Sequence, residues 1–452
     1  MVKFLKKLFL NDYIYCSIFV AVLLGSLYLI PVDSELTDPF GDALGDFEIT
    51  DLAFTHLRTK DPVADTNITI INTGVLGRAE LAEVIRKINA HKPAVVGFNE
   101  ILKKSDDYFG DSLLSAALRD VDNIVYTSKL SDYNDSTKQY AKLDICDTMF
   151  LQFEDTLGVK FAETGFENMF THERDFKSTR QFYERASING VQENFFAVEL
   201  VRVIAPERVE KFMKRAQPYE IINYKGNYEM FNTIDAEQAL NGEFDPSIIK
   251  GKIVILGYLG ASLSDEKFWD DYKYYTPLNK KYAGKTFPDM FETVIYANIA
   301  SQILNNTHIN LASNSLDFWL NFIICFLNVI IFSKLFHSAA VWWDIFSLII
   351  SLVEVLIILI STALIFSNYS YDINLNFSIV FVLVLGNFLE LYYGLLKIAI
   401  QKWTIKWRIL KEDRKRRDLK DLVTADAKNL MTKNLSEFNL DNLKNINNKN
   451  TE

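Results

Sequence analysis

The chain has 452 residues, of which 49% are hydrophobic, and its formal net charge at pH 7 is −10. The charge is uneven: counted along the sequence, residues 13–314 carry about −14, whereas residues 397–452 carry about +6. An acidic region of this size argues against nucleic-acid binding, since contact with phosphates requires a basic surface. The cysteines are too few and too scattered for a disulfide framework or a zinc site. They are Cys16, Cys146 and Cys325.

The N-terminal stretch has the pattern of a membrane anchor. Residues 1–12 are basic through three lysines, and residues 13–32 carry no charge over roughly the 20 positions needed to cross a bilayer. A cleaved signal peptide is the alternative, but its apolar core would be shorter, and no small-residue cleavage site precedes Asp33. We therefore expect an uncleaved membrane helix at residues 13–32, with residues 1–12 in the cytoplasm.

Residues 33–314 alternate between strand-like and helix-like patterns, which predicts an extracytoplasmic α/β domain with a mixed, largely parallel sheet and flanking helices. The polar residues 131–142 are expected to form a loop. The predicted strands are 67–72, 94–98, 123–128, 149–154, 161–162, 221–224, 231–233 and 253–256. The predicted helices are 42–60, 78–91, 111–119, 194–205, 207–216 and 291–304.

Residues 250–257, KGKIVILG, contain the clearest buried strand, because a short β-branched apolar run is bounded by Gly251 and Gly257. The sequence GYLG at residues 257–260 has some likeness to a phosphate-binding loop. It lacks the lysine and the further glycines of such loops, so a turn after a strand is the better interpretation.

Three long apolar runs, residues 315–336, 341–366 and 377–400, are each long enough to span a bilayer. Together with residues 13–32 they predict four transmembrane α-helices. The loop at 367–376 has no basic residue, whereas the tail at 401–452 is strongly basic. The positive-inside rule therefore predicts two cytoplasmic termini and a large domain outside. In the tail, residues 403–422 are expected to continue the last helix, and the Asn/Lys-rich residues 434–452 to be disordered.

Several segments in a fixed order carry a family resemblance. They are DLAFTHLR at 51–58, KPAVVGFNEIL at 92–102, KGKIVILG at 250–257, Asp265, the Thr276–Pro277 pair and YAN at 296–298. With one span before and three after it, the region 33–314 resembles the type-2 CHASE domain, an extracytoplasmic sensory module of bacterial signalling proteins. The resemblance implies a multi-pass protein of the bacterial inner membrane with its large domain in the periplasm.

The chain departs from the family pattern at three places. Where the family has acidic residues after its first strand, this chain has Asn72 and Thr73, and Asn99 followed by Glu100 replaces an aspartate after the second strand. Relatives commonly continue into a cyclase or kinase domain, for which residues 401–452 leave no room. The resemblance therefore implies a sensor whose output comes from another protein.

Two residues of the soluble region are candidates for ligand binding. Arg180 lies in a polar segment where the family domain often has an arginine, and Asp265 follows the KGKIVILG strand. The alternatives are a structural ion pair for Arg180 and a loop or helix-capping role for Asp265. Enzyme signatures such as G-x-x-x-x-G-K-[ST], G-x-S-x-G and H-E-x-x-H do not occur, so neither catalysis, a cofactor nor a metal is predicted.

Polar residues within the predicted spans are the other candidate contacts. Glu354 lies near the middle of one span, Asn387 near the middle of the next, and Glu390 about one turn further on. Ionisable groups at such depth usually face other helices and pair. Bonding between Glu354 and Asn387 is one interpretation, and a polar switch or partner-docking contact is the other.

These patterns predict a membrane sensory protein that is not an enzyme. Its periplasmic domain would sense a ligand or partner and relay the signal through the membrane helices to a separate effector in the membrane or cytoplasm. The expected partners are the lipid bilayer, that effector and a second copy of the chain. The competing hypothesis is a structural or docking subunit of a bacterial envelope complex that binds no ligand.

Overall fold

The computed structural model describes residues 12–28, 48, 50–58, 61–134, 139–155, 158–169, 178–264, 270–279, 286–338 and 342–447. Its contacts divide the chain into two compact units. The α/β unit comprises Pro31–Leu320 and Leu356–Asn376, and the helical unit comprises Met1–Ile30, Asn321–Val355 and Phe377–Glu452.

The predicted α/β domain is confirmed, and its described residues form a nine-stranded sheet. The strand order is β10-β9-β4-β3-β2-β13-β1-β12, with β7 beside β3. The central pairs β12–β1, β1–β13, β13–β2 and β2–β3 are all parallel. The strands are β1 (Asp65–Asn72), β2 (Val95–Phe98), β3 (Ile124–Asn134), β4 (Gln139–Asp144), β7 (Glu163–Phe166), β9 (Arg185–Ile188), β10 (Val191–Asn194), β12 (Phe231–Ile234) and β13 (Ile253–Gly257).

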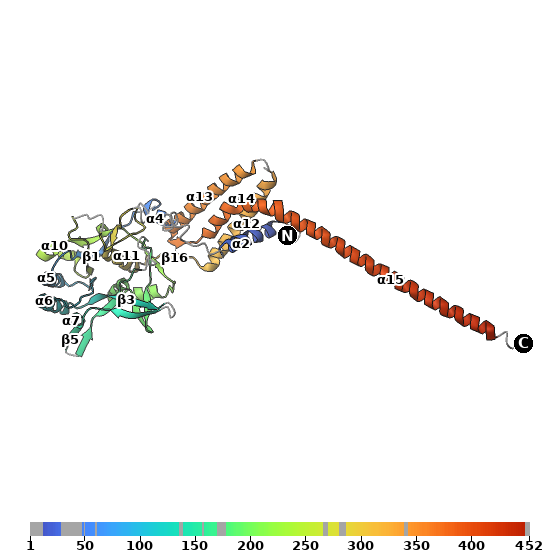
Figure 1. Cartoon of the computed structure of the whole chain (residues 1–452). Coiled ribbons are helices and arrows are strands. Elements are labelled where there is room, and N and C mark those ends of the chain that lie inside the picture. The colour runs from blue at the N-terminus through green and yellow to red at the C-terminus, as the bar shows by residue number, and fades with distance from the viewer. Residues whose placement is uncertain are drawn as a thin grey trace. The chain divides into compact units, whose positions relative to one another are not determined.

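Helices cover both faces of the parallel strands. On one face, α5 buries an apolar stripe at the helical spacing predicted from the sequence, together with α6 and α10 (Figure 1). On the other face, α8 and α11 pack over a second core. The helices are α5 (Arg78–Asn89), α6 (Tyr108–Arg119), α8 (Phe196–Ile204), α9 (Pro206–Met213), α10 (Ala236–Asn241) and α11 (Glu292–Asn305).

Strand β13 lies between β1 and β2, and all five of its residues are buried. Ile253 and Ile255 contribute to one core, whereas Val254 and Leu256 contribute to the other. The continuous apolar run of KGKIVILG is therefore explained by burial on both faces of the sheet.

The loop predicted at residues 131–142 is wrong for 131–134 and 139–142, because β3 continues to Asn134 and pairs antiparallel with β4; residues 135–138 lie outside the described residues. Leu130 opposes Leu143, and the rings of Tyr133 and Tyr140 lie 4.9 Å apart on facing strands. None of residues 131–134 and 139–144 is buried, so the polarity of the hairpin reflects its exposure.

Several shorter predictions need correction. The predicted strand at 149–154 begins instead as helix α7 (Thr148–Leu151), followed by β5 (Gln152–Asp155) and β6 (Gly158–Phe161). The predicted helix at 42–60 is described only in part: residues 42–47, 49 and 59–60 lie outside the described residues, and α4 (Asp51–Thr55) ends at Thr55, with His56 as its C-cap. The predicted strand at 221–224 is present only at its start, in β11, and the other short elements of the unit's described residues were not predicted. Together these short elements are β8 (Gln181–Phe182), β11 (Glu220–Ile221), η1 (Tyr228–Met230), η2 (Pro246–Ile248), β14 (Lys273–Tyr274), β15 (Met290–Phe291), β16 (Asn310–Leu311) and β17 (Tyr371–Asp372).

Four membrane helices were predicted, but only three helices among the described residues are long and apolar enough to cross a bilayer. Two are α12 (Asn314–Ser338) and α13 (Trp343–Tyr369). The third is formed by α14 (Asn376–Leu391), the π-helical turn η3 (Tyr392–Leu396) and the start of α15 (Lys397–Asn447). Helix α2 (Asp12–Tyr28) has a shorter apolar stretch, Tyr13–Ser26, and residues 29–32 lie outside the described residues.

The C-terminal tail is more helical than its composition predicted. Helix α15 continues as one element to Asn447 (Figure 1), so the predicted disorder is wrong for residues 434–447. Residues 401–436 of this helix are all exposed.

Candidate functional site

The carboxyl ends of β1 and β13 form the point at which the sheet topology changes. These strands are parallel neighbours, with Asn72 opposite Gly257. The helix after β1, α5, packs on one face of the sheet, whereas α11, the first long helix after β13, packs on the other face. Chains that leave neighbouring strands toward opposite faces create a crevice, which is the usual ligand position in open α/β sheets.

Asn72 joins the strand ends at this crevice and is fully buried. Its Oδ1 accepts hydrogen bonds from the backbone amides of Gly74 (3.0 Å) and Leu259 (2.9 Å). Its Nδ2 donates to Asp235 Oδ1 (2.8 Å) and to the Gly260 carbonyl (3.0 Å). The amide is therefore fully used within the protein. An aspartate here could not donate to Asp235, which explains physically why an amide stands where the family pattern has an acid.

The ends of β2 and β13 are fastened to the first turn of α11. Asn99 Nδ2 donates to Thr293 Oγ1 at 2.9 Å, and the neighbouring Glu100 side chain is exposed. Gly257 lies against the same threonine: a Cβ placed on it would be 2.2 Å from Thr293 Oγ1. The last glycine of KGKIVILG is thus required by the close approach of α11.

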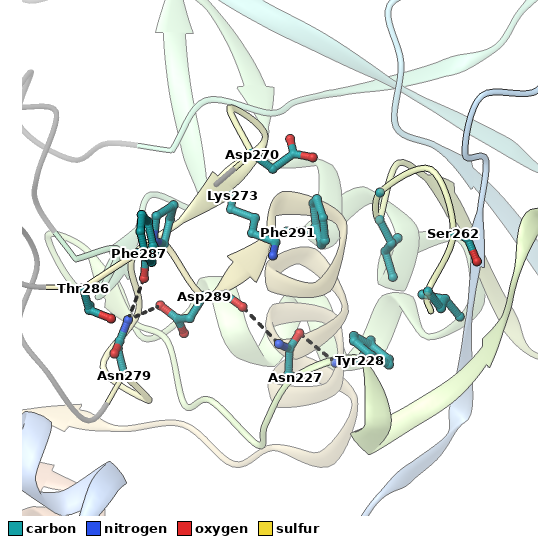
Figure 2. Close-up of a pocket in the computed structure, with 14 residues that line it drawn as sticks. Asn227, Tyr228, Ser262, Asp270, Lys273, Asn279, Thr286, Phe287, Asp289 and Phe291 are labelled. Carbon is teal, nitrogen blue, oxygen red and sulfur yellow. Dashed lines mark hydrogen bonds between the residues drawn. The ribbon is translucent and has the colours of Figure 1, made fainter. Parts of the chain in front are cut away.

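A cavity of about 330 Å³ lies beside these strand ends (Figure 2). Its walls come from the loop after β13, the turn before β12 and the β14–β15 hairpin. The volume is at the lower end of the range for small-molecule sites. The lining residues are Asn227, Tyr228, Leu259, Gly260, Ser262, Leu263, Asp270, Lys273, Asn279, Thr286, Phe287, Pro288, Asp289 and Phe291.

The cavity contains both charge signs next to aromatic surface. The Lys273 ammonium lies 4.9 Å from the centre of the Phe291 ring. Asp270 accepts hydrogen bonds from the Tyr258 hydroxyl (3.2 Å) and the Tyr272 amide (3.0 Å). This combination of a cation, carboxylates and amides suits a small polar ligand that has both donor and acceptor groups.

Asp289 organises the loop that contains the Thr276–Pro277 pair. Its carboxylate accepts from the Thr276 amide (2.9 Å), the Thr276 hydroxyl (2.5 Å) and Asn279 Nδ2 (3.3 Å). Its carbonyl accepts from Asn227 Nδ2 at 3.0 Å, which joins the loop to the turn before β12 (Figure 2). Burial raises the pKa of Asp289 to about 6, although these hydrogen bonds oppose the shift.

The carboxyl groups of Glu292, at the start of α11, and Glu167, just after β7, lie near each other. Burial raises the pKa of Glu292 to about 8, and the nearby Glu167 carboxylate adds to the shift. The Tyr274 hydroxyl donates to Glu292 Oε1 at 3.4 Å. This pair does not line the cavity, but Tyr274 follows the cavity residue Lys273 directly in β14.

Arg180 does not line the cavity. Its guanidinium forms a two-point ion pair with Asp51, with Nε 2.9 Å from Oδ1 and Nη2 2.7 Å from Oδ2. Only 13% and 12% of these two side chains are exposed. The pair fixes the first residue of α4, which supports the structural alternative for Arg180 over ligand binding. Asp265 lies outside the described residues.

An apolar cluster in the α/β unit joins segments that adjoin the helices able to span a membrane. We name it the membrane-proximal cluster: Ala53, Phe54, Ile221, Ile309 and Phe366. The rings of Phe54 and Phe366 meet edge to face, 5.5 Å apart. Strand β16, just before α12, pairs with β17, just after α13, in parallel register. Sequence patterns could not find this cluster, since its residues are up to 313 positions apart.

The polar residues of the predicted spans lie on α13 and α14. Among the described residues, Glu354 Oε2 has no hydrogen-bond partner, and no hydrogen bond joins Glu354 to Asn387, whose side chain is exposed. Of the two interpretations, interhelical bonding between Glu354 and Asn387 thus has no hydrogen bond to support it in this part of the chain. Glu390 instead lies beside Trp343 and Asp344 in the first turn of α13.

Within the described ranges, no group of three or more His, Cys, Asp or Glu residues is placed to hold a metal ion. The site is thus a cavity at the switch point of a parallel α/β sheet, in a chain with helices that can span a membrane. These features define an α/β domain joined to helices that are long and apolar enough to span a membrane.

The CHASE2 domain family model matches residues 49–333, and the chain belongs to this family of extracytoplasmic sensor domains. The predicted family is thereby confirmed. No curated protein and no solved structure gives a significant match to the chain. The CHASE2 family membership and the three long apolar helices of the described residues together indicate a membrane sensory receptor.

Proposed function

We propose that the cavity at the β13 end binds a small polar ligand, and that α11 relays its binding toward the membrane. The observation that carries this proposal is the position of α11 in the chain. Phe291, the residue before α11, lines the cavity, and the other end of α11 leads through β16 directly into α12. A displacement of the cavity wall can therefore act on a membrane helix through one buried helix.

The membrane-proximal cluster supplies the next step of the proposed relay. β16 is hydrogen bonded to the loop after α13: the Asn310 amide donates to Ser370 O and the Ala312 amide to Asp372 O, both at 2.8 Å. The Ser367 hydroxyl, near the end of α13, donates to Leu57 O at 2.9 Å. This bond connects the segment after α4 to the same group of contacts. A shift of α11 would thus be felt at α12, α13 and α4 together.

The output of this receptor comes, in our proposal, from a separate effector, and the chain itself is not an enzyme. Helix α15 is a suitable docking element, because its exposed residues include Leu419, Leu422, Val423 and Leu430. Glu354 is the proposed contact for a partner helix within the bilayer, since its Oε2 is unpaired within the described part of the chain. Replacing Glu354 with Leu is expected to weaken effector association, and unchanged association would remove this role.

For the topology, we propose that α2 is a fourth span. The protein would lie in the bacterial inner membrane with both termini in the cytoplasm and the CHASE2 domain in the periplasm. The lysines before residue 13 and the basic residues after Lys397 support this orientation.

Ligand binding can be tested on the full chain in lipid nanodiscs by thermal shift with a panel of amino acids, amines and dicarboxylic acids. We expect at least one compound to raise the melting temperature. Thr286→Trp, which fills the cavity, should abolish the shift, whereas Val191→Trp at an exposed strand position should retain it. The sensor proposal fails if no compound acts and a stoichiometric envelope complex persists without a small molecule.

A further inference from the structure

A second cavity, of about 590 Å³, lies in the α/β unit at the end of a membrane-spanning helix. Phe366, Ser367 and Asn368, in the last turn of α13, form part of its wall. The remaining wall comes from α4 and the segment after it, from Asn223 and Lys225 after β11, from the end of α11 and the residues that follow, and from Ser370. Its volume lies within the range of about 300–1,000 Å³ that small-molecule sites occupy. The cavity therefore lies at one end of a helix that is long and apolar enough to cross a bilayer.

Arg58 is the main cationic group of this cavity, which we name the membrane-proximal cavity. The half-buried guanidinium donates from Nη2 to Tyr224 O at 2.6 Å and from Nη1 to Lys225 O at 3.5 Å, and it lies 5.7 Å from the Phe54 ring centre. Within the described ranges, no carboxylate is within 4.0 Å of Arg58; Asp61 acts on it from further away. Buried charges are normally paired, so this guanidinium is suited to an anionic ligand.

The other charges of the cavity decide what kind of anion fits. Lys225 is already balanced, because its Nζ lies 3.2 Å from Asp65. That carboxylate also accepts hydrogen bonds from Ser301 Oγ (2.5 Å) and Asn305 Nδ2 (2.7 Å). Asp61 is exposed and lines the same cavity. The walls thus present one positive group and one negative group that form no direct ion pair within the described residues, a pattern that suits a zwitterion.

Apolar side chains complete the cavity. Phe54, Ile309 and Phe366 lie together in the membrane-proximal cluster and line the cavity wall. Val63 lines it too, although 79% of its side chain is exposed. Exposed apolar surface beside the end of a span is suited to contact with the glycerol and first acyl carbons of a lipid.

We propose that the membrane-proximal cavity binds a zwitterionic phosphodiester headgroup, with the phosphate on Arg58 and the ligand's amine toward Asp61. Arginine binds phosphate oxygens through paired N–H donors, which a lysine cannot reproduce. Two kinds of molecule contain such a zwitterionic phosphodiester: a phospholipid of the bilayer and a free glycerophosphodiester. The cavity lies beside the end of α13, and this position favours the membrane phospholipid over the free glycerophosphodiester. A bound headgroup would contact α4, α13 and the end of α11, so lipid composition would act on the same elements as the proposed relay.

The test uses the full chain in nanodiscs that contain equal amounts of phosphatidylethanolamine and phosphatidylglycerol, with retained lipid counted by native mass spectrometry. Wild type should retain phosphatidylethanolamine preferentially. Arg58→Gln should lower this retention about tenfold or more, as expected for loss of a charge-assisted phosphate contact. Arg86→Gln, at an exposed arginine of α5, is the matched control.

Asp61→Asn provides a second readout, because an exposed residue can be changed without loss of folding. It should remove the preference for the ethanolamine lipid while total lipid retention persists. Adding glycerophosphoethanolamine to detergent-solubilised protein distinguishes a lipid ligand from a free diester. If this compound binds in an Arg58-dependent way while no lipid is retained, the site belongs to the free diester and the lipid proposal is refuted. Equal retention of both lipids, unchanged in Arg58→Gln and Asp61→Asn, would refute the proposal.

Discussion

The substitution Asn72→Asp replaces a carboxamide by a carboxylate at the end of β1 and should strongly destabilise the domain. Asn72 Nδ2 donates to Asp235 Oδ1 at 2.8 Å and to Gly260 O at 3.0 Å, and the side chain is fully buried. An aspartate would lose both donations and place a second carboxylate against Asp235. The two acceptor bonds, from Gly74 and Leu259, would remain.

The magnitude follows from these contacts. Leaving a buried polar group without its partner costs about 1–3 kcal/mol, and an unpaired buried charge costs about 3–5 kcal/mol. We therefore expect a loss of about 3–5 kcal/mol near neutral pH, or a fall in melting temperature of roughly 10 °C for a domain of this size. The new carboxyl pair would share a proton, so its folded-state pKa would be raised. The variant should regain stability as the pH falls toward the carboxyl range.

The assay is thermal unfolding of the full chain in detergent, followed by circular dichroism between pH 5 and pH 8. Asn123→Asp is the control, because Asn123 is exposed and donates a single hydrogen bond, to Ala94 O. It should change the melting temperature by no more than about 2–4 °C, since an exposed hydrogen bond contributes about 1 kcal/mol. A fall for Asn72→Asp that equals the control, or that does not depend on pH, would refute the role given to Asn72.

Three further predictions concern other contacts. Gly257→Ala should lower the melting temperature, and Thr293→Ala added to it should restore part of the loss, because the clash is chiefly with the threonine hydroxyl; absence of any rescue would contradict the close contact. Arg180→Gln should raise amide hydrogen exchange in α4, since it breaks the ion pair to Asp51 at the start of that helix, and unchanged exchange would argue against it. The pKa of Glu292 is raised to about 8, so the folded state holds its proton more tightly and stability should fall as the pH rises through this value. Glu292→Gln should flatten this part of the melting profile between pH 6 and pH 9, and an unchanged slope would contradict the assignment.

The parallel sheet was predictable because its strands are buried on both faces. A continuous apolar run such as Ile253–Leu256 indicates a strand that is buried on both faces, even when the partner strands are unknown. The β3–β4 hairpin was missed for the opposite reason, since its strands are partly exposed and their polar residues are typical of a loop. Patterns of polarity thus detect burial more reliably than they detect strand pairing.

The candidate site was predictable only in fragments. The Thr276–Pro277 pair was recognised from the family resemblance, but its partner Asp289 was not, because the bond depends on how the β14–β15 hairpin closes. The function of Asn72 depends on Asp235 and Leu259, which are 163 and 187 positions away. Such contacts follow from strand order, which sequence patterns did not supply.

The sequence left open whether Glu354 bonds to Asn387, because depth within a helix does not fix the direction of a side chain. Both residues lie in apolar helices, but the Asn387 side chain is exposed in the structure. Pairing between helices depends on their relative rotation, which packing of the whole bundle determines.

The proposed relay is tested most directly by hydrogen exchange at the Asn310 and Ala312 amides of the full chain in nanodiscs. These amides bond to Ser370 O and Asp372 O, next to the end of α13. Filling the cavity with Thr286→Trp should change their exchange rates several-fold, whereas Val191→Trp should leave them unchanged. Unaltered exchange in both variants, with Thr286→Trp folded and its cavity blocked, would contradict the claim that α11 connects the cavity to the membrane helices.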